Sequence, residues 1–148
     1  MEEIINESNW LEIAKNAAIK AGEKILQIYS EDFSVTYKND NSPLTIADQQ
    51  ANEIIEGYLS KTNIPILSEE GKLTDYKVRK NWELLWIVDP LDGTKEFVKR
   101  NGEFTVNIAL VKDGVPILGV IFVPVKGWLY YGSPKGSYRE IDDEKECL

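Results

Sequence analysis

Histidine is absent from this chain of 148 residues, and cysteine occurs once, at Cys147. Without histidine, the chain can form no Ser-His-Asp triad, no Cys-His pair and no histidine-ligated zinc or iron site. A single cysteine forms no intrachain disulfide and no cysteine cluster for zinc. Any metal ion that these residues bind must therefore take mainly oxygen ligands, which favours magnesium, calcium or manganese.

Positive charge and long apolar runs are also scarce. The 25 acidic residues outnumber the 17 basic ones, for a formal charge of -8, so no broad basic face is available and we expect no nucleic acid polymer as a partner. No apolar run approaches the roughly 18 residues that span a bilayer, and the first ten residues are acidic where a signal peptide would be basic. We expect a cytoplasmic protein, and leave open a peripheral association with the inner face of the cell membrane.

Two segments have the apolar spacing of helices. Steps of three and four residues predict helices over Trp10–Tyr29 and Ile46–Leu59. Asn9 and Glu12 would form a capping box at the first helix, and Thr45 would be the N-cap of the second.

The remaining sequence has the pattern of strands, and Lys112-Asp113-Gly114 is typical of a hairpin turn between two of them. Two helices followed by strands predict an α+β fold, with the two helices packed on a mostly antiparallel sheet. The polar segment 139–148 shows no pattern of its own. The predicted strands cover residues 33–37, 66–68, 82–88, 104–111, 115–124 and 127–133.

The segment "LLWIVDPLDGTKEF" carries an acidic motif at the end of a predicted strand. The apolar run Leu84–Val88 is typical of a strand buried on both faces, and Asp89 follows where that strand should emerge. Pro90 favours extended backbone at Asp89, and the Asp92-Gly93 pair permits a tight turn. Two carboxylates held this close repel each other unless a cation neutralises them, so the motif indicates a divalent-metal site.

A second acidic motif has the same form, because the short strand at Ile66–Ser68 leads into Glu69 and Glu70. If this strand lies beside that of Trp86, the carboxylates of both motifs converge, and such oxygen ligands suit octahedral magnesium with water and phosphate in the remaining positions. Taken singly, each motif is more often an ordinary turn or solvated loop. Their occurrence together in a chain without histidine favours the metal site.

The residues after the acidic motif suit a phosphate group. "GTKEFVKR" predicts a short helix, whose first N–H groups at Gly93 to Lys95 would face an anion. Lys95 is close enough to this turn to contact a phosphate, with a solvated surface position as the alternative, whereas Lys99 is expected at the surface.

These motifs resemble a known family. "WIVDPLDGTKEF", preceded by "LSEEG" and "KNDNSPLTIAD", resembles the lithium-sensitive, magnesium-dependent phosphatase superfamily that includes inositol monophosphatases. The stretch from Asp89 to Val111 is similar to the bacterial CysQ-type 3′(2′),5′-bisphosphate nucleotidases, whereas inositol monophosphatases tend toward "IDGT-T-N-F" there. The resemblance implies a layered α/β/α/β/α sugar-phosphatase-like fold and hydrolysis of adenosine 3′,5′-bisphosphate, a small-molecule nucleotide bisphosphate, to AMP and phosphate.

The resemblance also implies roles for individual residues. The complete enzyme would bind two or three magnesium ions. Their ligands would be the side chains of Glu69, Asp89 and Asp92 and the backbone carbonyl of Leu91. The substrate would be contacted by Glu69, Leu91, Asp92, Gly93, Thr94 and Lys95.

The implied catalytic residues are Thr94, Asp48 and Glu70. The Thr94 hydroxyl, paired with Asp48, would assist a metal-activated water, and Glu70 would orient that water. Without the resemblance, Asp48 is a first-turn acid favoured by the helix dipole. Lys38 would lie near the metals.

The chain also departs from the family, whose members are longer and carry a further aspartate in a "W-D-x-A-A-G"-like motif that residues 1–148 lack. We therefore interpret residues 1–148 as an N-terminal metal-binding phosphatase domain, an incomplete enzyme whose C-terminal domain is missing. We expect residues 1–148 to associate with that missing domain or to form a homodimer. Two alternatives are an inositol monophosphatase and a catalytically inactive, truncated metal-binding module.

Overall fold

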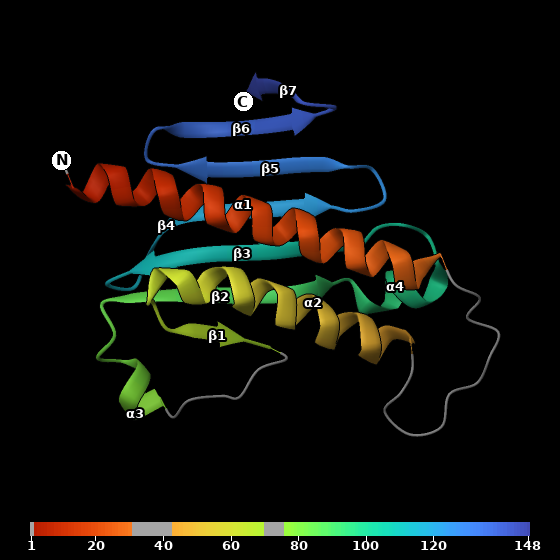
Figure 1. The fold of residues 1–148 in the computed structure, drawn as a ribbon, viewed down its shortest axis with the longest axis horizontal. Helices are drawn as coiled ribbons and strands as arrows, with labels where there is room; N and C mark the ends of the chain where they lie inside the picture. Colours follow the sequence, from red (N-terminus) through yellow and green to blue (C-terminus); the bar gives the residue numbers. More distant parts are fainter. Residues whose placement is uncertain (1, 31–42, 70–75) are drawn as a thin grey trace.

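The computed structural model describes residues 2–30, 43–69 and 76–148. In this part of the chain, two long helices, α1 (Glu2–Tyr29) and α2 (Pro43–Leu59), pack side by side against one face of a seven-stranded sheet (Figure 1). The strands lie in chain order: β1 (Ile66–Ser68), β2 (Leu84–Asp92), β3 (Thr105–Lys112), β4 (Val115–Val123), β5 (Trp128–Ser133), β6 (Gly136–Ile141) and β7 (Glu144–Cys147).

Three short helical segments connect these elements. A 3-10 turn, η1 (Ser60–Thr62), ends α2, α3 (Tyr76–Arg79) precedes β2, and α4 (Thr94–Lys99) follows β2. Strands β1 and β2 are parallel, with Leu67 beside Ile87, and every other neighbouring pair in the sheet is antiparallel. The prediction of an α+β fold with a mostly antiparallel sheet is therefore confirmed.

The hairpin between β3 and β4 is also confirmed. Lys112 ends β3, Val115 begins β4, and the two residues between them, Asp113 and Gly114, have positive φ angles of 49° and 80°. Positive φ at both central positions is the geometry that matches the twist of antiparallel strands.

The core lies between the helices and the sheet. The buried face of α1 includes Ala14, Ala17 and Ala21, as its spacing predicted, and Ala47 and Ala51 are buried on α2. These small side chains let the two helices approach closely. Larger buried side chains fill the sheet side of the core: Trp86, Val88, Val106, Ile108, Leu110, Val120 and Phe122.

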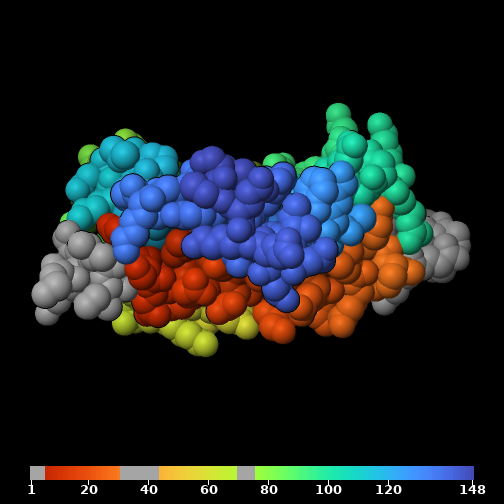
Figure 2. Space-filling model, turned by 90° about the horizontal axis from the view of Figure 1, so that it is seen from above, coloured from red at the N-terminus to blue at the C-terminus, as the bar shows by residue number. Residues whose placement is uncertain are grey.

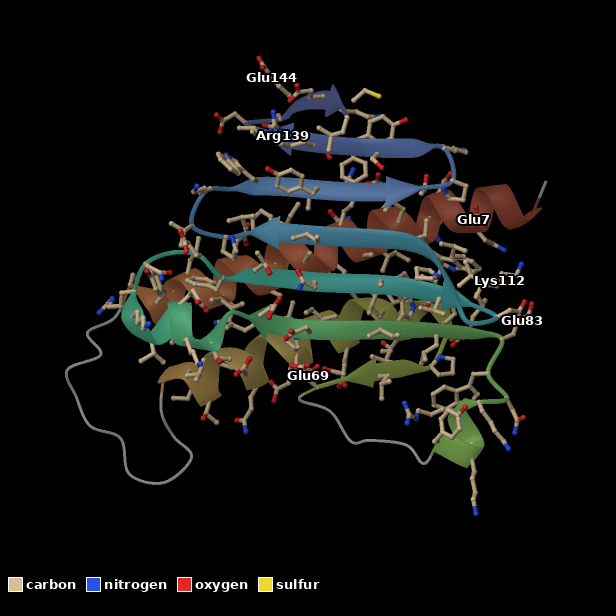
Figure 3. The ribbon with its side chains drawn as sticks, turned by 180° about the vertical axis from the view of Figure 1, so that it is seen from behind. Glu7, Glu69, Glu83, Lys112, Arg139 and Glu144 are labelled. Carbon is tan, nitrogen blue, oxygen red and sulfur yellow. The ribbon has the colours of Figure 1, made fainter. Side chains whose placement is uncertain are left out.

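The other face of the sheet is not covered by any helix of the described residues, as the view from behind shows (Figure 3). In the edge-on view, the two long helices α1 and α2 form a layer below the strands (Figure 2). Side chains on β3 alternate between buried and partly exposed, and on β2 Ile87 is 42% exposed between the buried Trp86 and Val88. The prediction that β2 is buried on both faces is therefore wrong, because in the part of the chain that the structure describes only one face carries helices.

Both helices begin earlier than predicted. Helix α1 starts at Glu2, so Asn9 lies inside it and the Asn9–Glu12 capping box is wrong; one asparagine costs a helix less than about 1 kcal/mol and does not end it. Helix α2 starts at Pro43, which suits a first helical position, so Thr45 lies within the first turn and is not the N-cap.

The polar segment 139–148 is the largest correction to the expected fold. It forms the second half of β6 and all of β7, an antiparallel pair at the edge of the sheet. Polar residues suit a strand at an exposed edge, where charges discourage pairing with another chain, and the apolar alternation used for prediction is weak there.

The predicted strand at residues 33–37 lies outside the described residues. Among the residues that the structure describes, no helix has both the length and the apolar character needed to cross a membrane.

Gly22 tests how closely α1 approaches the sheet. A Cβ atom at Gly22 would lie 2.4 Å from Cε2 of the Phe122 ring on β4, whereas a Cβ at Gly57 in α2 would contact nothing within 4 Å. We expect Gly22→Ala to lower the free energy of unfolding by about 1–3 kcal/mol because of overpacking. Gly57→Ala, the matched control, should raise it by about 0.5–1 kcal/mol through helix propensity. Urea unfolding measures both, and equal effects of the two substitutions would contradict this packing.

Candidate metal and phosphate site

Parallel pairing of β1 with β2 brings two predicted metal ligands together. Ser68 lies beside Val88, and the Glu69 N–H donates a hydrogen bond of 3.3 Å to the Val88 carbonyl, which extends the pairing by one residue. Glu69 therefore lies next to Asp89, at the end of β1 (Figure 3), and the two carboxyl groups are close enough to share a hydrogen bond. The predicted convergence of the two acidic motifs is confirmed for this pair.

Strand β2 does not end at Asp89, as the sequence suggested, but continues to Asp92. Its pairing with β3 is interrupted between these two residues, where Pro90 and Leu91 are buried. Such an irregularity bends a strand and redirects its side chains. By alternation, Asp89 shares the uncovered face of the sheet with Ile87, and the exposed Asp92 follows beyond the break.

The carboxyl group of Asp89 is in an unfavourable environment for negative charge. Burial, then the nearby charges of Glu69 and Asp92, raise the pKa of Asp89 from 3.8 to about 6, and only a hydrogen bond from the Leu91 backbone opposes them. Crowded carboxylates of this kind are stabilised when a cation binds among them.

The end of β1 is fixed by a buried contact with α2. The Ser68 hydroxyl, 2% exposed, donates a hydrogen bond to the side-chain oxygen of Asn52, which is 6% exposed. Glu69 directly follows Ser68 in the chain, so this contact also helps to fix the position of the Glu69 backbone. The apolar spacing on α2 gave no indication of Asn52.

The segment after Asp92 turns sharply into α4. Gly93 has a φ angle of +95°, and a Cβ there would lie 3.0 Å from the Glu103 carbonyl oxygen. Helix α4 is held by an aromatic cluster in which the rings of Tyr29, Phe97 and Phe104 have centroids 5.0–5.5 Å apart. The predicted short helix is confirmed.

Three other predicted site residues lie on α2 and at the start of α4. Thr94 and Lys95 are exposed at the start of α4, Asp48 is 7% exposed on α2, and α2 contacts α4. The pairing of Thr94 with Asp48 stays a prediction, as do the substrate contacts. Glu70 and Lys38 lie outside the described residues.

Asn107 on β3 is a member of the site that the sequence did not reveal. It lies opposite Asp89 in the sheet, and its side-chain Nδ2 donates a hydrogen bond of 3.1 Å to Oδ2 of Asp92. A polar amide inside the apolar strand "FTVNIALV" was the available signal, because asparagine is depleted in strands.

The donor chemistry of this site suits magnesium. Glu69, Asp89 and Asp92, with the Leu91 carbonyl, offer only oxygen atoms, the ligands that magnesium prefers. In the part of the chain that the structure describes, however, no three acidic, cysteine or histidine side chains are gathered closely enough to hold an ion unaided. The described residues thus fit as part of a ligand set that other groups and water must complete.

Sequence comparison identifies the family. A sequence model of the inositol monophosphatase family matches residues 6–141. The chain belongs to this family. It is 47% identical over 134 residues to the 3′(2′),5′-bisphosphate nucleotidase CysQ of Salmonella typhimurium, an alignment that covers 88% of this chain and 54% of that protein. It is also 47% identical over 127 residues to CysQ of Escherichia coli K12, covering 83% of this chain and 51% of that one.

Solved structures of the inositol monophosphatase family have the same fold. The crystal structure of CysQ from Bacteroides thetaiotaomicron is 56% identical, with a TM-score of 0.83 over 95% of this chain and 53% of that one. An inositol monophosphatase from Anabaena is 30% identical, with a TM-score of 0.73 over 90% of this chain and 48% of its own. The chain thus spans about half the length of the relatives that it matches.

The raised pKa of Asp89 predicts how stability depends on pH without divalent cations. Because folding raises this pKa from 3.8 to about 6, the native state binds the proton more tightly, and stability should fall as pH rises through that window. Asp89→Asn removes the ionisation, so in EDTA we expect it to raise the free energy of unfolding at pH 7.5 by about 1 kcal/mol after solvent screening. Urea unfolding at pH 7.5 and below pH 4 checks this. A gain of the same size at both pH values would contradict it.

Gly93 predicts a separate effect on stability. Gly93→Ala should cost about 2–3 kcal/mol, because positive φ is unfavourable for alanine and the new methyl group meets the Glu103 backbone. Gly114 also has positive φ, but a Cβ there would contact nothing within 4 Å, so Gly114→Ala should cost about 1 kcal/mol. Chemical unfolding compares the two, and equal losses would show that the Glu103 contact is unimportant.

Proposed function

We propose that residues 1–148 are the N-terminal, metal-binding part of a magnesium-dependent phosphomonoesterase that hydrolyses adenosine 3′,5′-bisphosphate to AMP and phosphate. The observation that carries this proposal is the meeting of Glu69 and Asp89 at the parallel β1–β2 pair. The similarity to CysQ nucleotidases of several bacteria supports the choice of substrate.

In this proposal, the metal ligands are Glu69, Asp89, the Leu91 carbonyl and Asp92. Bound magnesium, two or three ions in the complete enzyme, supplies neutralisation of the phosphoryl charge and a more acidic water molecule. Asp89 is held by the pairing of β2 with β3, and the Leu91 backbone lies in the buried break that follows it.

The phosphate group lies against the turn from Asp92 to Lys95. Gly93 allows this turn to pass close to the Glu103 backbone, and the N–H groups that begin α4 have no partner within the helix and point toward the anion. The Thr94 hydroxyl assists the attacking water and is oriented by Asp48, while Glu70 completes the orientation of that water. Lys95 adds a positive charge beside the phosphate.

The uncovered face of the sheet is where this part of the molecule meets further protein. Ile87 and Ile121 are 42% and 45% exposed there, and Asp89 lies on the same face. A C-terminal domain packed on this face would complete the metal ligands and enclose the nucleotide, and a homodimer would cover the same apolar surface.

Phosphate release tests the proposed function. The purified chain is incubated with Mg²⁺ and either adenosine 3′,5′-bisphosphate or inositol 1-phosphate, and binding of Mn²⁺ is measured in parallel. Because this chain supplies only part of the proposed ligand set, we expect slow release from the nucleotide, and a further loss of that release by at least about 100-fold in Asp89→Asn, which removes a metal ligand.

Each other outcome identifies a different function. Release from inositol 1-phosphate alone would make the chain an inositol monophosphatase. Binding of Mn²⁺ without hydrolysis of either compound would make it a metal-binding module. If neither Mn²⁺ binding nor hydrolysis were detected, the proposed metal site itself would be wrong.

A further inference from the structure

A chain of two hydrogen bonds crosses the strand break that separates Asp89 from Asp92. The Thr105 hydroxyl donates to Oδ1 of Asn107 at 3.0 Å, and Nδ2 of Asn107 donates to Oδ2 of Asp92 at 3.1 Å. Thr105 and Asn107 are two residues apart on β3, so both side chains lie on the same face of the sheet.

The direction of the Asn107 amide follows from its two partners. The ionised Asp92 carboxylate can only accept hydrogen bonds, so it requires the NH₂ group of the amide on its side. The amide oxygen then faces Thr105, whose hydroxyl can donate to it. The two contacts therefore select one orientation of the amide.

The position of Asn107 connects two predicted metal ligands. It is the partner of Asp89 in the β2–β3 register, whereas Thr105 is the partner of Asp92. From its place opposite Asp89, the amide reaches along the sheet to the next carboxylate. Asp92 itself is exposed and follows the irregular part of β2, so packing does little to fix its side chain.

We propose that Asn107 is a positioning residue that sets the direction of the Asp92 carboxylate for binding a divalent cation, with Thr105 holding the amide in place. Carboxylates that bind metals are commonly oriented by hydrogen bonds to their outer oxygen, and losing such a partner weakens metal binding by about 10- to 100-fold. The proposal rests on the metal site of the proposed function.

The prediction concerns the affinity for Mn²⁺, measured by calorimetric titration of the whole chain in the absence of substrate. Asn107→Leu keeps the approximate size of the side chain and removes both polar groups. We expect it to raise the Kd for Mn²⁺ by about 10-fold. Thr105→Val should raise the Kd by a smaller factor, because the amide remains but is free to turn. Thr105→Ser, the matched control, retains the hydroxyl and should leave the Kd within about twofold of the unmodified chain.

Urea unfolding in EDTA separates positioning from a general loss of structure. If Asn107→Leu does not fold, the comparison of Thr105→Val with Thr105→Ser still decides the matter. The positioning role of Asn107 is overturned if the Kd for Mn²⁺ is unchanged or lower in Asn107→Leu and Thr105→Val. It is also overturned if Thr105→Ser weakens Mn²⁺ binding as much as Thr105→Val does.

The result for the unmodified chain distinguishes the two proposals. If it binds Mn²⁺, Asp89→Asn abolishes the binding and Asn107→Leu does not change it, the proposed metal site stands and only the role of Asn107 is wrong. If the unmodified chain binds no Mn²⁺, the metal site fails, and the role assigned to Asn107 fails with it.

Discussion

The parallel pairing of β1 with β2 is the constraint on which the site depends. It places the carboxyl groups of Glu69 and Asp89 side by side, although their mutual repulsion and the burial of Asp89 oppose this. Packing elsewhere must offset that cost. The Ser68–Asn52 contact attaches β1 to α2, and the indole N–H of the buried Trp86 donates a hydrogen bond of 3.0 Å to the Thr62 hydroxyl. The fold thus holds together two carboxyl groups that repel each other. A bound cation would reduce that repulsion.

The one-sided cover of the sheet gives its two faces different roles. The helix-covered face is closed by small side chains on α1 and α2 and by larger ones on the central strands, so that face of β2 is packed in the core. The opposite face carries Asp89 and Asn107 within a hollow of about 530 Å³ lined mainly by apolar atoms. The acidic side chain of Asp89 therefore lies on the uncovered side of a sheet whose covered side contains the core.

Much of the architecture could be predicted because it is encoded in local patterns. The inner face of α1, the Asp113-Gly114 turn and the helix at Thr94 each depend on spacing or on residue types with strong backbone preferences. The predictions failed where the decisive contacts are distant. The strand β6 is polar, yet it pairs with β5. Its Glu140 also forms an ion pair with Lys15 of α1, whose ammonium group lies 3.0 Å away. Likewise, the apolar run of β2 could not show which of its faces a helix would cover.

The chemistry proposed for this protein follows from local sequence motifs alone. The absence of histidine, the two acidic motifs and Gly93-Thr94 predict oxygen ligands and a phosphate-binding turn, because these predictions depend on residue types and their spacing. Which of these side chains lie close together depends on the pairing of the strands. The register of β1 on β2 places Glu69 beside Asp89, and the register of β3 on β2 places Asn107 within reach of Asp92. Strand register arises from side-chain packing across the whole sheet, and no single segment contains that information.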